Sequence, residues 1–268
     1  METRSSTVRA LYAVLAAGTF MEFVGHGALG IKGVASWTSY FAVAGISAEH
    51  ARMLMPYVGC FDLTLAFSLM LPSRAAMLYM AAWGLFTALL RPLSGESAWE
   101  AVERAGNYGP VFALFLLGQP GGLRSWLGFR RRDSLPASRD LAVRRVLLGS
   151  TVLLLLGHGM LGLCVQKPLF AQHYASIGLQ SPWVEPGVGA LECMLALAVL
   201  LAPSRPLLLG VLAWKLASES LSPLAGAPVW VFIEHGGSYA APLALALLLW
   251  GAPVALRRGA AGGLALGG

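Results

Sequence analysis

The fold is decided by a stretch that the chain carries twice, as GHGALG at residues 25–30 and as GHGMLG at residues 157–162. Three further pairs follow in the same order: PYVGCFD (56–62) with PGVGALE (186–192), LPSR (71–74) with APSR (202–205), and WEAVERAGNYGP (99–110) with WVFIEHGGSYAAP (230–242). Matching positions lie 130–132 residues apart. A separation that holds over about a hundred residues indicates a duplicated unit.

The composition is that of a membrane protein. Hydrophobic residues make up 57% of the chain and charged residues 12%, with a mean hydropathy of +0.67. Soluble domains carry about 25% charged residues. Apolar runs long enough to cross a bilayer recur throughout. The net charge of +6 is explained by basic loops, so the sequence predicts contact with lipid and no binding of nucleic acid.

Each half offers four hydrophobic spans, which predicts an all-α integral membrane protein with eight transmembrane helices in two four-helix repeats. The expected spans are 10–29, 56–71, 75–90 and 99–117, then 146–165, 186–201, 206–221 and 230–250. The first is expected to be a retained helix, because its internal counterpart begins with basic residues in the same way. The aromatic segments 31–55 and 163–185 are expected to lie at the interface or to fold back on the bundle.

The basic residues predict the orientation. Thirteen of the 19 fall on one side: Arg4, Arg9, Arg74, Arg124, Arg130, Arg131, Arg132, Arg139, Arg144, Arg145, Arg205, Arg257 and Arg258. The positive-inside rule then places both termini in the cytoplasm, in a cell inner (cytoplasmic) membrane. The expected domains are a first repeat at 1–123, a basic cytoplasmic linker at 124–145 and a second repeat at 146–268. An even number of spans in each half makes the two repeats parallel.

Ionisable and aromatic residues recur inside these apolar spans. The candidate ligand-binding residues are His26, Glu22, Asp62, Glu103 and Trp83 in the first half and His158, Glu192, Glu234 and Trp214 in the second. We expect one imidazole and two carboxylates to converge near the outer leaflet in each repeat. Such groups bind metals, relay protons or hydrogen-bond a quinone. The alternative is that the carboxylates pair with Arg or Trp only to fix the packing.

The two halves also differ at polar positions. Glu22 lies on the same helical face as His26, but its counterpart is Leu154. Conversely, Lys215 and Glu219 have the spacing of a helical ion pair, where the first half has Gly84 and Ala88. This asymmetry predicts either one working site or two unequal ones.

Each half resembles the DoxX/DoxD-like family of four-helix membrane proteins. The similar features are the Gly-rich end of the first span (GHGALGIKG), an aromatic stretch that ends in Gly (YFAVAG, HYASIG), and a Gly with an acidic residue three positions later (VGCFD, VGALE). The resemblance implies a membrane subunit associated with quinone-linked oxidation. The tandem duplication and the His before Gly depart from the family's single four-helix unit.

These observations predict a redox-associated, quinone-linked subunit that binds an apolar ligand near the outer leaflet, with other membrane redox subunits as partners. The catalytic residues and the cofactor stay undetermined, and no metal centre is expected. A transporter or metal-handling protein and a purely structural subunit of a larger membrane complex are the alternatives. Phosphate-binding loops, HExxH and CxxCH are absent from the sequence, which argues against nucleotide-driven chemistry.

Overall fold

The computed structural model describes residues 5–119 and 121–250, and its regular structure is helical apart from isolated β-bridge positions, among them the bridge between Gly118 and Arg131. The long helices are α1 (Ser5–Lys32), α3 (Ala48–Ser68), α4 (Arg74–Leu93), α8 (Ala137–Met160), α10 (Val184–Leu201) and α11 (Arg205–Leu224). The last stretch of each half forms two helices, α5 (Ala98–Glu103) with α6 (Ala105–Leu116) and α12 (Val229–Ile233) with α13 (Gly236–Trp250). Shorter elements are a 3₁₀ turn (Ala35–Trp37), α2 (Thr38–Ala42), α7 (Leu123–Leu127), a π-helical turn (Leu161–Val165) and α9 (Pro168–Ala175).

Six helical segments of the described chain are long and apolar enough to cross a membrane: Ser5–Lys32, Arg74–Leu93, Ala137–Val165, Val184–Leu201, Arg205–Leu224 and Val229–Trp250. These are the features of a multi-pass membrane protein. Two expected spans, 56–71 and 99–117, are not among them. The first lies in α3, which also carries Glu49, Arg52 and Asp62, and the second is broken at Arg104 into two short helices.

Several expected boundaries need correction. The expected linker ends early, because α8 begins at Ala137 and residues 137–145 are helical. The expected fold-back segment 31–55 also ends early, since α3 begins at Ala48. The spans expected as continuous at 99–117 and 230–250 are each broken. Pro110 and Pro242 lie inside the helices that follow these breaks.

Glycines allow the first helix of each half to approach the next long helix closely. A methyl group on Gly59 of α3 would lie 2.6 Å from the carbonyl oxygen of Gly27 on α1. A methyl group on Gly189 of α10 would likewise lie 2.6 Å from the carbonyl oxygen of Gly159 on α8. Small residues commonly permit such contacts between membrane helices. The motif GHG therefore sets the distance at which the histidine faces its neighbouring helix.

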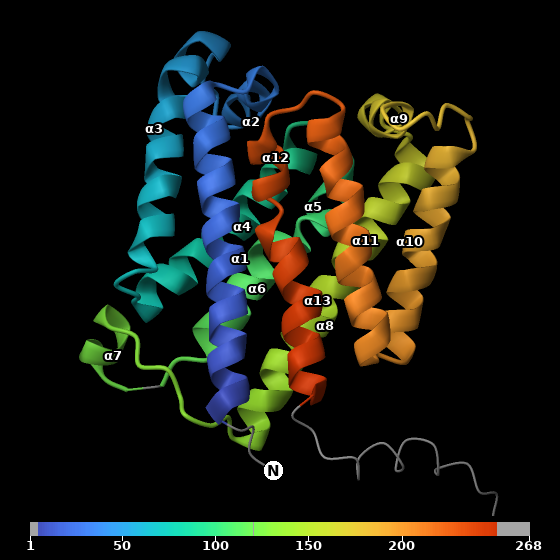
Figure 1. Cartoon of the computed structure of the whole chain (residues 1–268). Coiled ribbons are helices and arrows are strands. Elements are labelled where there is room, and N and C mark those ends of the chain that lie inside the picture. Colours follow the sequence, from blue (N-terminus) through green and yellow to red (C-terminus); the bar gives the residue numbers. More distant parts are fainter. Residues whose placement is uncertain (1–4, 120, 251–268) are drawn as a thin grey trace, which may run out of the picture.

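The two halves interlock instead of forming separable bundles. Helix α1 packs against α12 and α13 of the second half, and α8 packs against α5 and α6 of the first (Figure 1). Gly25 lies against the backbone of Glu234, and Gly157 lies against the backbone of Glu103. The helices α2, α9 and α12 lie at the upper end of Figure 1, whereas α7 and the first turn of α1 lie at the lower end.

Candidate functional site

Three predicted residues of the first half meet on neighbouring helices. His26 of α1 and Asp62 of α3 are joined by a hydrogen bond of 2.8 Å between Nδ1 and Oδ2. Trp83 of α4 donates its indole N–H to Oδ1 of the same carboxylate at 2.9 Å. Asp62 is 1% exposed, so both of its oxygens are satisfied in a buried position. Because an ionised carboxylate only accepts hydrogen bonds, Nδ1 of His26 carries the hydrogen and Nε2 is left for another partner.

The second half contains the same two contacts. His158 Nδ1 pairs with Glu192 Oε2, and Trp214 donates to Glu192 Oε1 at 2.8 Å. Glu192 is completely buried. All six residues come from the predicted candidate set, and the structure joins them into two equivalent groups of three.

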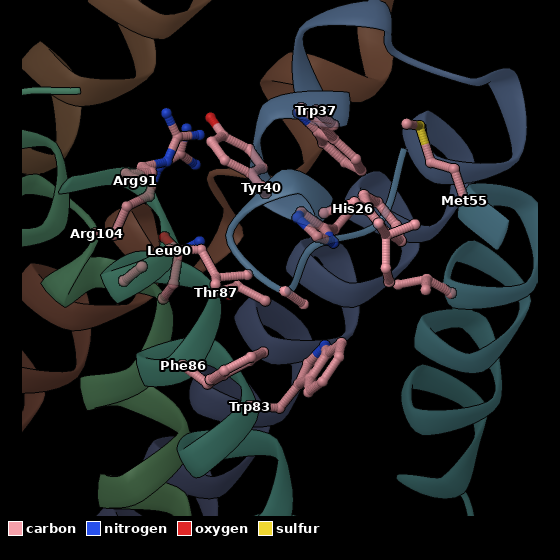
Figure 2. Close-up of a pocket in the computed structure, with 16 residues that line it drawn as sticks. His26, Trp37, Tyr40, Met55, Trp83, Phe86, Thr87, Leu90, Arg91 and Arg104 are labelled. Carbon is pink, nitrogen blue, oxygen red and sulfur yellow. The ribbon is translucent and has the colours of Figure 1, made fainter. Parts of the chain in front are cut away.

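A cavity of about 180 Å³ opens beside the first group. His26 lies on its wall with Trp37 stacked on the imidazole, at a ring-centroid distance of 4.4 Å and an angle of 24°. Figure 2 shows Trp37 and Trp83 on either side of His26. The remaining wall is mostly apolar: Phe41, Ala44, Ile46, Met55, Val58, Phe86, Ala88 and Leu90. We call this cavity the His26 pocket.

Small residues on α4 make room for the His26 pocket. Ala88 lines it directly, and Gly84 lines a narrow recess at its inner end. The corresponding positions of α11 carry Lys215 and Glu219 instead. Their side chains form an ion pair of 2.7 Å, and Lys215 is completely buried. Lys215 Nζ also lies 3.8 Å from Oε1 of Glu192, so charged side chains stand beside the second group where the first group has open space.

The wall opposite His26 is polar, but its charges are neutralised. Arg91 donates to Glu96 at 3.1 Å and to Glu100 at 3.2 Å, and Lys167 of the second half also pairs with Glu100. Tyr40 of α2 donates its hydroxyl to Glu96 at 2.6 Å. Burial raises the pKa of the Tyr40 phenol, so this hydroxyl stays protonated and remains a donor at neutral pH.

Glu103 and Glu234 do not join the histidines, contrary to the expected convergence of two carboxylates on each imidazole. They meet at Arg104, whose Nε lies 3.2 Å from Glu103 Oε2 and whose Nη1 lies 3.8 Å from Glu234 Oε1. The reason is the interlocked packing, which brings the breaks of the two last stretches together at the centre of the molecule. The pair between Arg104 and Glu234 joins the two halves.

Several pocket residues were missed by reasoning from the sequence. Trp37 and Tyr40 belong to the segment 31–55, whose aromatic character was the available signal, but no pattern placed them over His26. Asn107 and Thr87 also line the His26 pocket. They are ordinary polar residues of apolar helices, and only the packing shows their position.

The described residues contain no group of three or more His, Cys, Asp or Glu side chains placed to hold a metal ion. A metal-handling protein could use His26, Glu22, Asp62 and Glu103 as ligands, but Glu103 faces Arg104, and Asp62 is already held by His26 and Trp83. Comparisons with protein-family models, with curated proteins and with solved structures find no match for this chain.

Proposed function

We propose that the chain is a multi-pass protein of the cell inner membrane with eight crossing segments in two parallel halves, related to the DoxX/DoxD-like proteins that its motifs resemble. Helix α3 supports the additional crossings, because it is 21 residues long and about 30 Å in length at 1.5 Å per residue. Its exposed side chains include Tyr57, Phe61 and Phe67, which suit a lipid-facing surface.

We further propose that the His26 pocket binds a neutral, quinone-like ring. The observation that carries this proposal is an imidazole fixed at one nitrogen by Asp62, with its other nitrogen free at the edge of an aromatic pocket (Figure 2). A neutral imidazole accepts a hydrogen bond from a hydroxyl at Nε2, and a protonated one donates to a carbonyl oxygen. Trp37 and Trp83 provide faces and edges against which a flat ring can pack.

The size and the charge of the pocket both fit such a ligand. A dry cavity of about 150 Å³ is large enough to bind benzene, and the His26 pocket measures about 180 Å³. Arg91 and Arg104 on its wall are each paired with two carboxylates, so the pocket does not favour an anion. A quinone, when bound, would supply two-electron redox chemistry, and His26 would orient its oxygen and hold or release a proton there.

The role that follows is that of a redox-associated subunit, with the electrons exchanged with another membrane protein. The test is a titration of the purified protein with a ring-only benzoquinone, followed by the quenching of tryptophan fluorescence. We expect saturable binding to the wild type and to His158→Ala, and loss of binding in His26→Ala. Because the two histidines have matching contacts, His158→Ala controls for general damage. Absence of saturable binding to the folded wild type would overturn the proposal.

A further inference from the structure

Glu22 is a buried carboxyl group for which the helix packing gives no partner. It lies four residues before His26 on α1 and is 4% exposed. Its Oε2 has no hydrogen-bond partner among the described residues. A methyl group on Gly237 of α13 would lie 2.9 Å from this oxygen, so the carboxyl is enclosed by the second half. Leu154 stands at the corresponding position of α8, so only the half with the His26 pocket has this group.

A narrow recess beside Glu22 shares part of its wall with the His26 pocket. The recess is lined by Glu22, Phe23, His26, Asp62, Trp83, Gly84, Thr87 and Asn107. Four of these residues, His26, Trp83, Thr87 and Asn107, also line the pocket. The volume of the recess is about 10 Å³, which is close to the least space that holds one water molecule. Its polar wall offers that water the hydrogen-bond partners it needs.

The charged groups around Glu22 leave it without a counter-ion of its own. Asp62 of α3 faces it but is committed to His26 and Trp83. Arg104, between α5 and α6, is the nearest cation, and it already pairs with Glu103 and with Glu234 of the second half. One guanidinium is thus shared among three carboxyl groups. A buried carboxyl group without a counter-ion is more stable when it takes up a proton than when it keeps its charge.

We propose that Glu22 is a proton-binding site, a neutral carboxylic acid that exchanges its proton with the His26 pocket through one water in the recess. Each exchange moves one proton from Glu22 to the water while another leaves the water toward the pocket, and the reverse sequence restores the acid. Exchange with a bound quinone rests on the proposed function. Proton binding at Glu22 and its route through the recess do not.

Infrared spectroscopy tests the protonation directly, because a neutral carboxylic acid has a C=O stretch at a higher frequency than an ionised carboxylate has. The spectrum of the full-length wild type minus that of Glu22→Gln should show an acid band from Glu22 at neutral pH. Glu22→Asp should keep an acid band, with both variants eluting as the wild type does. In heavy water the band should move to a lower frequency as a deuteron replaces the proton on Glu22.

The rate at which this band shifts in heavy water tests the route. Gly84 lines the recess but not the pocket, and its Cβ position has only ordinary contacts at 3.5 Å and beyond. Gly84→Val should therefore fold and slow the exchange at Glu22. Gly210→Val on α11, where nothing lies within 4 Å, is the matched control and should exchange as fast as the wild type does.

The outcomes separate the two proposals. If the folded wild type shows no acid band from Glu22, or if both valine variants exchange equally fast, the proton site or its route is wrong. A ring-only benzoquinone should slow the exchange at Glu22. If it does not slow the exchange while Gly84→Val still does, the quinone assignment fails and the proton site stands.

Discussion

The surroundings of His26 and of His158 show how one arrangement of helices can carry an open site and a closed one. Both imidazoles are held by a buried carboxylate, and both carboxylates accept a tryptophan N–H. The difference lies one helix away. Gly84 and Ala88 leave a pocket beside the first histidine, whereas Lys215 and Glu219 place a buried ion pair beside the second. The carboxylate–histidine contact is therefore part of the scaffold, and the small residues of α4 are what make a ligand site.

The largest effect is expected from breaking the ion pair of the closed half. Lys215→Met leaves Glu219 and Glu192 without their buried cation, which should lower the free energy of unfolding by about 3–5 kcal/mol. Chemical unfolding in detergent measures this. The double variant Lys215→Met/Glu219→Leu removes both charges and should recover most of the stability. A loss below about 1 kcal/mol in the single variant would show that the pair behaves like one at a protein surface.

Transplanting the ion pair tests what separates the open site from the closed one. Gly84→Lys/Ala88→Glu should fill the His26 pocket with a pair at helical i,i+4 spacing. We expect the Kd for a ring-only benzoquinone to rise at least about 100-fold, which corresponds to about 2.7 kcal/mol. Fluorescence titration measures the change, and Gly84→Ala is the control that should bind normally. Unchanged binding in the folded double variant would place the ligand elsewhere.

A substitution at the glycine contacts should affect both halves alike. Gly59→Ala and Gly189→Ala each place a methyl group 2.6 Å from a carbonyl oxygen of the neighbouring helix, and such overpacking costs about 1–3 kcal/mol. The matched control is Gly210→Ala, which meets no atom within 4 Å and should be neutral or slightly stabilising because alanine favours the helix. A large difference between the two variants would mean that the halves do not share this packing.

The smallest effect is the difference in stability expected between the phenylalanine variants of Trp83 and Trp214. Trp83→Phe leaves Asp62 Oδ1 without its hydrogen-bond donor. The free energy of unfolding should fall by about 1–3 kcal/mol, because a buried acceptor is left unsatisfied. Trp214→Phe should cost less, because Lys215 still lies 3.8 Å from the same oxygen of Glu192. Unfolding of both variants under one condition gives the difference, and an equal loss would mean that Lys215 does not compensate.

Part of the site could be predicted from the sequence because the recurring motifs mark it. Residues such as His26, Asp62 and Trp83 stand out when they recur in order within apolar spans, where a buried polar group requires a partner. The sequence could not place Glu103 and Glu234. Their positions depend on the breaks in the last helices and on the packing of each half against the other, and neither leaves a periodic signal.

The sequence by itself determined that this is a helical protein built for a membrane, because apolar content and span length follow directly from composition. It also marked the two carboxylate–histidine pairs and the positions at which the halves differ. Only the tertiary structure decided that Trp37 covers His26, that Arg104 joins the two halves, and that a pocket opens in the first half. These features depend on how side chains from distant segments fill the space between helices, and close packing is a property of the assembled molecule.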